Sequence, residues 1–203
     1  MGKELNKNVT TIPLTDVALA VVTTIETHSK TYGFETATTV STEEITQTTE
    51  EKNLEIKGTV YAAKPSKTIV LGYNLTLTNN VFIPELAALF SGGTVEVDNS
   101  SKAFKKFTPP NVGTTPKKTK FKIDFYSEEN DEGGPTGNYL KISFDKCEGV
   151  SVPITMEDGT YFSSEMTLQS RPGAGQPPYV AELVAELPTI PDLSAVSEAK
   201  IRK

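Results

Sequence analysis

The chain has no tryptophan, one cysteine and one histidine among its 203 residues. The single cysteine, Cys147, excludes a disulfide within the chain. His28 has no second histidine and no cysteine nearby in the sequence, which excludes a local metal cluster or a local Cys–His pair. We therefore expect His28 to be an exposed loop residue and Cys147 to be a small buried thiol.

The sequence also lacks a secretory leader and a membrane-spanning run. Its start, MGKELNKNVTTIPL, has no positively charged stretch followed by an apolar one. No apolar run approaches the roughly 18 residues that a bilayer-spanning segment requires. We expect a protein that is made and folded in a cytoplasm and has no membrane partner.

Hydrophobic residues are scarce, at 36%, so the core should be modest. The formal net charge is −6 and the isoelectric point is near 5.0. This acidic balance argues against general affinity for nucleic acid, because phosphate binding needs clustered lysine and arginine.

Motifs for catalysis or for ligand binding are also missing. The acidic run at residues 128–132 lacks the alternating ligands and closing glutamate of a calcium loop, so we interpret it as a solvated hairpin loop. Gly173 and Gly175 lack the lysine of a phosphate-binding loop and are interpreted as turn residues. Acidic residues are numerous, and a carboxylate pair assembled by folding stays open as an alternative. The sequence favours a protein that is not an enzyme and needs no metal or cofactor.

Hydrophobic periodicity predicts a mainly β chain that forms a single domain over residues 1–203. The clearest strand is 69–77, in which every odd position is apolar. Residues 179–187 fit a helical stripe as well as a strand, and their short length beside prolines favours the strand. Further strands are predicted at 17–25, 94–97, 119–126, 139–144 and 161–168, with 119–126 and 139–144 paired as a hairpin. The expected fold is a β-sandwich or partly open barrel with one short α-helix and a long projecting hairpin loop.

Residues 34–45 have the composition of a strand, rich in threonine, but no apolar face in either register. A strand that is wet on both sides survives only where neighbouring strands satisfy its backbone, as in an extended hairpin or a channel wall. Its expected partner is 54–63. The polar segment between them is predicted to form a projecting tip. This tip comprises Thr46, Gln47, Thr48, Thr49, Glu50, Glu51, Lys52 and Asn53.

The segment IPELAALFSGG predicts a short helix that packs on the sheet, because two turns alone are unstable in water. A proline opens it, apolar residues form one stripe, and two glycines end it. These residues are Pro84, Leu86, Leu89, Phe90, Gly92 and Gly93.

Lysines cluster in the middle of the chain, with seven and no acid between residues 102 and 122. Residues 101–118 are predicted to form a long surface loop rich in lysine and proline. One interpretation is a solvated basic loop; the other is an interface with an acidic segment of a second copy, such as residues 43–55. The candidate interface lysines are Lys102, Lys105, Lys106, Lys117 and Lys118. Residues 189–203 are expected to form a polar tail that crosses a surface.

The layout of residues 34–97 resembles the major tail tube proteins of long-tailed, siphovirus-like bacteriophages. A polar strand, a projecting loop and a returning strand lead through LGYNLTLTNN into IPELAALFSGG and a new strand at 94–97. The later segment PPYVAELVAEL is similar to the closing strand of those subunits.

This resemblance implies a structural subunit of the virion tail, assembled in the cytoplasm of a host bacterium. Such subunits form hexameric rings that stack into a hollow tube around a tape-measure protein, meet tail-completion proteins, and conduct DNA when the genome is ejected. An acidic lumen would repel phosphate and let DNA pass. The resemblance makes residues 46–53 the candidate contact with the next ring.

Three alternatives stay open from the sequence. The inner tube of a contractile tail or tailocin is the nearest. A β-sandwich binding or adhesion module on a phage or cell surface would be a stable monomer with a ligand patch on its loops. An enzyme would need clustered acids in a cleft.

Overall fold

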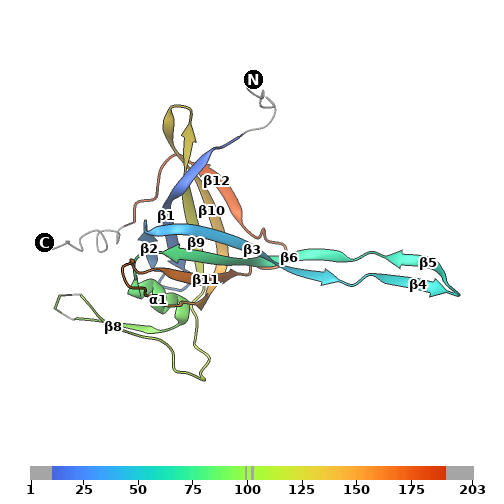
Figure 1. The fold of residues 1–203 in the computed structure, drawn as a ribbon, viewed down its shortest axis with the longest axis horizontal. Helices are drawn as coiled ribbons and strands as arrows, with labels where there is room; N and C mark the ends of the chain where they lie inside the picture. The colour runs from blue at the N-terminus through green and yellow to red at the C-terminus, as the bar shows by residue number, and fades with distance from the viewer. Residues whose placement is uncertain (1–10, 99, 102, 191–203) are drawn as a thin grey trace.

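The computed structural model describes residues 11–98, 100–101 and 103–190, and it is mainly β with one short helix (Figure 1). In chain order the elements are β1 (Leu14–Thr24), β2 (Thr31–Phe34), β3 (Ala37–Thr49), β4 (Lys52–Ile56), β5 (Thr59–Lys64), β6 (Lys67–Asn79), α1 (Pro84–Ser91), β7 (Thr94–Val97), β8 (Phe104–Thr108), β9 (Phe121–Asp131), β10 (Gly134–Ser151), β11 (Ser164–Ser170) and β12 (Val180–Val184).

One antiparallel sheet contains most of the strands, in the order β2-β1-β9-β10-β11-β6-β3, with β12 added on β10. The strands at its two ends, β2 and β3, follow each other directly in the chain, through the buried residues Phe34 and Ala37. The sheet therefore folds over on itself and encloses a core, but it does not close into a barrel. The mainly β, sandwich-like fold expected from the sequence is confirmed.

Helix α1 fills one end of this core. Leu86 and Phe90 are fully buried, and the Phe90 ring lies 5.1 Å from the ring of Phe121 on β9. Pro84 opens the helix, and Gly92 ends it in the left-handed conformation, with its N–H donating to the Ala88 carbonyl. The predicted helix is confirmed, with Leu89 half-buried beside the core and Gly93 directly after the cap.

A second, smaller cluster lies on the opposite face of β1 and β9. Leu19, Val21 and Tyr126 are buried there against Ile190. The neighbouring strand β12 is fastened to β10 by an ion pair of 2.7 Å between the Lys141 ammonium and Glu182. Ile190 of the predicted polar tail therefore contributes to a core, Thr189 is exposed, and the rest of that tail lies outside the described residues.

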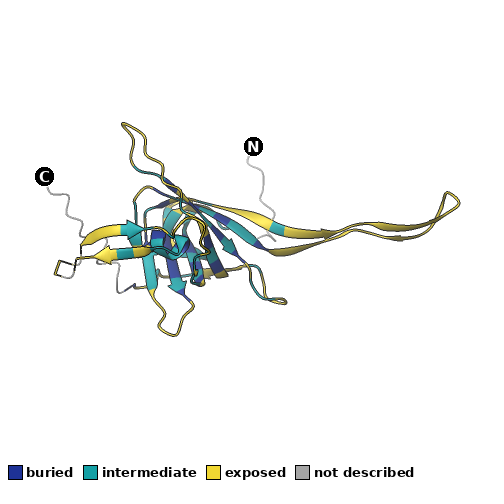
Figure 2. Ribbon diagram, turned by 90° about the horizontal axis from the view of Figure 1, so that it is seen from below, coloured by how far each residue is buried: buried dark blue, intermediate teal, exposed yellow. Residues whose placement is uncertain are grey.

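A long arm projects from the body (Figure 1). Strands β3 and β6 pair along their whole length, up to Thr49 opposite Lys67. After a break, β4 and β5 continue the ribbon to a two-residue turn at Lys57 and Gly58, which both have positive φ. The arm is exposed over nearly all its length, in contrast to the buried centre of the body (Figure 2).

Two predictions about this arm are wrong. Residues 46–53 form its shaft rather than its tip, and within 34–45 the residues from Ala37 onward pair with β6 instead of 54–63. The segment LEIKGTVYAA contains a turn at Lys57–Gly58, so it makes two short strands that pair with each other. The long polar strand is then free to pair with the equally long β6.

The remaining strand predictions hold with shifted ends. The hairpin of 119–126 with 139–144 corresponds to β9 and β10, and 179–187 contains a strand, β12, rather than a helix. The loop predicted at 101–118 is partly wrong, because 104–108 forms β8 and pairs with β7. The ring of Phe82 contacts the rings of Phe104 and Phe107 and so packs the β7–β8 hairpin against the body.

Replacing Gly149 with alanine should destabilise the body. A methyl group on Gly149 would overlap the backbone of Phe90, so helix and sheet would have to move apart. We expect the free energy of unfolding to fall by about 1–3 kcal/mol, the usual cost of overpacking. Urea unfolding measures it, with Gly133→Ala as the control, since a methyl group there would meet only the flexible end of Asp131. Equal midpoints for both variants would contradict this packing.

Candidate functional site

Strand β3 leaves one edge of the sheet open. It has 13 residues and pairs with β6 on one side, while no strand in the described part of the chain is hydrogen-bonded to its other side. Beyond Ala37 none of its residues is buried, and only Val40 and Ile45 are half-buried. Its outer edge therefore offers a long row of backbone donors and acceptors to a partner.

The outward face of β3, β6 and β11 forms a regular polar surface, the polar grid. Cross-strand register places Glu43 beside Asn74 and Gln169, Ser41 beside Thr76 and Thr167, and Thr39 beside Thr78 and Glu165. The grid holds two carboxylates and no basic side chain. The Gln169 amide donates to the Asn74 side-chain oxygen at 3.1 Å, while Arg171 at the edge of the grid donates to Gln169 at 3.0 Å.

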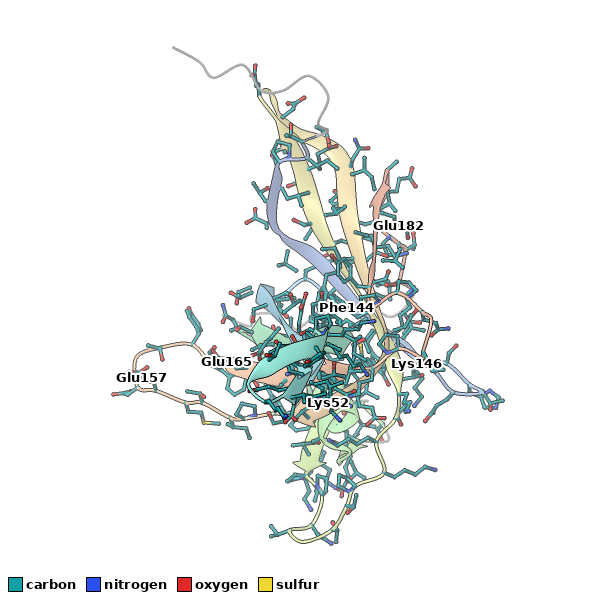
Figure 3. The ribbon with its side chains drawn as sticks, turned by 90° about the vertical axis from the view of Figure 1, so that its right-hand side faces the viewer. Lys52, Phe144, Lys146, Glu157, Glu165 and Glu182 are labelled. Carbon is teal, nitrogen blue, oxygen red and sulfur yellow. The ribbon has the colours of Figure 1, made fainter. Side chains whose placement is uncertain are left out.

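The distal arm, β4 and β5, is exposed at every residue. Lys52 and Lys64 face each other directly across the ribbon, an arrangement that disfavours the isolated hairpin. Next to them, Leu54 is opposite Ala62, and Leu54, Ile56 and Tyr61 expose about half or more of their surface. Figure 3 looks along the arm, on which Lys52 is labelled. In this view the arm is separate from the projecting loop that carries Glu157.

An open apolar groove lies between the two halves of the folded sheet, with a volume of about 610 Å³. Its walls come from β1, β3, β6, β9 and β10, together with Tyr179. On one of these walls the Tyr73 hydroxyl of β6 donates to Glu44, its cross-strand neighbour on β3, at 3.1 Å. Partial burial and this hydrogen bond raise the pKa of Tyr73. The residues lining the groove are Leu14, Val17, Val40, Thr42, Glu44, Tyr73, Phe125, Tyr126, Ser127, Leu140, Ile142, Phe144 and Tyr179.

The structure distributes the predicted basic patch over two segments. Lys105 and Lys106 are exposed on β8, and Lys117 is exposed in the segment before β9. Lys118 is half-buried, and its ammonium donates to the Gly149 carbonyl of its own chain. Lys102 lies outside the described residues, so the charge-patch interface stays a prediction.

His28 is exposed and Cys147 is fully buried, as predicted. Burial raises the pKa of the Cys147 thiol to about 12. Within the described ranges, no three histidine, cysteine or acidic side chains are grouped so that they could hold a metal ion. None of the helical residues described makes a segment long and apolar enough to cross a membrane.

Sequence reasoning found the polar strand but missed the groove and the polar grid. The alternation of Leu75 and Leu77 with Thr76 and Thr78 carries the signal for the grid. The groove has no local signal, because its walls come from strands that are distant in the sequence.

No family model matches the chain, and no curated protein matches it either. Among solved structures, a chain from the cryo-EM structure of the anti-feeding prophage baseplate, 6-fold symmetrised, is similar over 88% of this chain and 100% of its own. The TM-score is 0.38 and the sequence identity is 8%. A likeness of that size does not establish a shared fold or function.

The Cys147 thiol should resist a thiol-specific reagent at pH 8 in the folded protein and react once the chain is unfolded. Raising the thiol pKa from 9.0 to about 12 leaves roughly a thousandfold less thiolate. Because the unfolded chain loses this proton first, the contribution of the thiol to stability should fall between pH 9 and pH 12. Labelling with and without guanidinium, with Cys147→Ala as the blank, measures the protection. Fast labelling of the folded protein would refute it.

Proposed function

We propose that this chain is a structural, non-catalytic subunit of a bacteriophage tail tube. Copies form rings, hexameric by the resemblance of residues 34–97 to tail tube proteins, and the rings stack into a hollow conduit for DNA. The subunit would belong to the tail of the virion and assemble in the host cytoplasm. Its proposed partners are further copies of itself, a tape-measure protein and tail-completion proteins.

The observation that carries the proposal is strand β3. It is long, almost entirely polar, unpaired along one edge by any described strand, and continuous with an arm that stands clear of the described body. Isolated two-stranded ribbons are marginally stable at best. A second copy that pairs with β3 would satisfy its edge and extend the sheet from subunit to subunit around a ring.

The polar grid is the proposed wall of the lumen. Hydroxyl and amide groups keep it wet, while Glu43 and Glu165 give it negative charge, and the cation bonded to it, Arg171, lies at its edge. Such a surface repels phosphate, so DNA would slide along it without binding. The arm points away from the body and is the proposed contact with the next ring.

A binding module on a phage or cell surface is the second candidate. The apolar groove favours it, because pockets of roughly 300–1,000 Å³ commonly hold ligands. That function leaves the arm and the free edge of β3 without a role. A module of this kind would stay monomeric at high concentration, whereas a tube subunit assembles.

Removing the distal arm should abolish tubes and leave the body folded. Thr49 and Lys67 are directly opposite, so residues 50–66 can be replaced by an Asn-Gly turn. The free energy of unfolding should change by less than about 1 kcal/mol, because the removed strands bury nothing. Negative-stain electron microscopy of concentrated protein reads out tubes, and Lys57→Asn, which retains the arm, is the matched control.

Two results would count against these ideas. Tubes of normal length from the shortened variant would remove the arm from ring stacking. An unmodified chain that sedimented as a monomer at every concentration would overturn the tube proposal and favour the binding module.

Reversing the charge of the grid should make the tube bind DNA. Glu43→Lys with Glu165→Lys leaves the exposed positions polar, so we expect tubes to form. A short labelled DNA duplex should then sediment with the tubes at roughly 50 mM salt. It should be released at roughly 200 mM salt, because binding that depends on counterion release weakens as salt rises. The control, Glu157→Lys with Asp158→Lys, has the same net charge on an exposed loop. Equal binding by both variants would show that the grid does not line the path of DNA.

A further inference from the structure

We propose that the apolar groove is the docking site for the distal arm of a second copy of this chain. This inference rests on the proposed tube function and names the surface that receives the arm. It joins two features that each lack a partner within the described residues: a ribbon whose apolar side chains are all exposed and an apolar groove that is open.

The arm brings apolar side chains in a short extended ribbon. Leu54, Ile56 and Val60 expose 56%, 48% and 56% of their surface, and Tyr61 exposes 66%. An aromatic ring among aliphatic side chains is the usual composition of an anchor at the centre of a protein interface. The ribbon is narrow, so it can enter a groove that excludes a globular domain.

The groove is lined mainly by apolar side chains, which match those that the arm exposes. Val17 and Ile142 are half-buried at its walls, and Leu14 exposes 39% of its surface at its rim. Leu183 on β12 exposes 50% of its surface beside Leu140, its cross-strand neighbour, and extends the apolar wall. A ribbon seated here would cover side chains that otherwise face water on a subunit with a modest core.

Charge complements the apolar fit. Glu44 is the one charged residue in the groove lining, and Glu129 is the cross-strand neighbour of the lining residue Leu14. Residues 52–64 of the arm contain three lysines and one acid. The directly opposed Lys52 and Lys64 repel each other in the free arm, and carboxylates of the receiving copy would relieve that repulsion.

The geometry of such a contact suits a filament. Arm and groove are different surfaces of one chain, so each copy can receive one arm and offer another, which builds an open series of copies rather than a closed dimer. The pairing of the arm is interrupted between the Thr49–Lys67 and Lys52–Lys64 pairs. This break lets the distal ribbon change direction at the entrance of a neighbouring groove.

Cysteine crosslinking in the assembled full-length protein tests the inference. The double variant Leu54→Cys and Thr42→Cys places one thiol on the arm and one in the exposed part of the groove lining, while the buried Cys147 stays unreactive. Mild oxidation should give a ladder of multimers on a non-reducing gel. Leu54→Cys with Val112→Cys is the control, since Val112 is fully exposed elsewhere, and it should give roughly tenfold less multimer.

Each other outcome has a definite meaning when tubes are imaged in the same samples. Tubes without a disulfide between positions 54 and 42 would overturn the docking site and leave the tube function intact. A ladder without tubes would keep the docking site and overturn the tube. Monomers without crosslinks would overturn both. If Thr42→Cys crosslinks with Ala199→Cys instead, the groove receives the C-terminal residues, and the inference is wrong.

Discussion

The unpaired backbone of β3 is the constraint on which the rest of the structure depends. Every N–H and C=O group along a strand needs a hydrogen-bond partner, and water supplies it only while the strand stays exposed. β3 meets this requirement with threonine, serine and glutamate on both faces, which keep it wet in the free subunit. The same composition prevents the strand from being buried in its own core. No described strand covers its free edge, and a long exposed edge without charge or partner would invite uncontrolled pairing. The arm continues this constraint outward, because β4 and β5 are exposed at every residue.

The body must then be stable with little help from β3, which adds only Ala37 and Val40 to the core, and with none from the distal arm. Its core is concentrated where α1 meets β9 and β10, and the contact is close enough that Gly149 lies directly on the backbone of Phe90. Gly72 has the same role on β6, where a side chain would overlap the Ser170 carbonyl. These two glycines let the folded sheet pack tightly with few hydrophobic residues. A compact body of this kind holds the base of the arm in a fixed direction, which an assembly contact at the far end of the arm requires.

Hydrophobic periodicity and residue composition predicted most strands and the helix, since both signals are local in the sequence. The alternation at Leu75 and Leu77 and the Pro84 to Gly92 pattern determine their elements without reference to the rest of the chain.

The arm was placed incorrectly because the turn at Lys57–Gly58 is a two-residue signal inside a strand-like segment, and its φ angles are visible only in the structure. β8 was missed because the prolines at 109 and 110 and the nearby lysines have the composition of a loop, while the partner strand and Phe82 supply the order. The groove is a property of the folded sheet alone, since Val17, Val40 and Ile142 meet only after three distant strands have been placed.

Threonine would allow one strand to serve both a free subunit and the proposed assembled one. Its branched Cβ favours extended backbone, so β3 keeps its shape with only one hydrogen-bonded neighbour, and its hydroxyl accepts water or a cross-strand partner equally well. The pair of Thr48 and Thr68 hydroxyls, 2.9 Å apart across the arm, shows this bonding within the ribbon. A leucine or valine at such positions would stabilise the assembled state through burial but would expose an apolar edge before assembly. Exposed apolar residues lie instead on the distal arm and in the groove, two small surfaces that would meet in the proposed contact between copies.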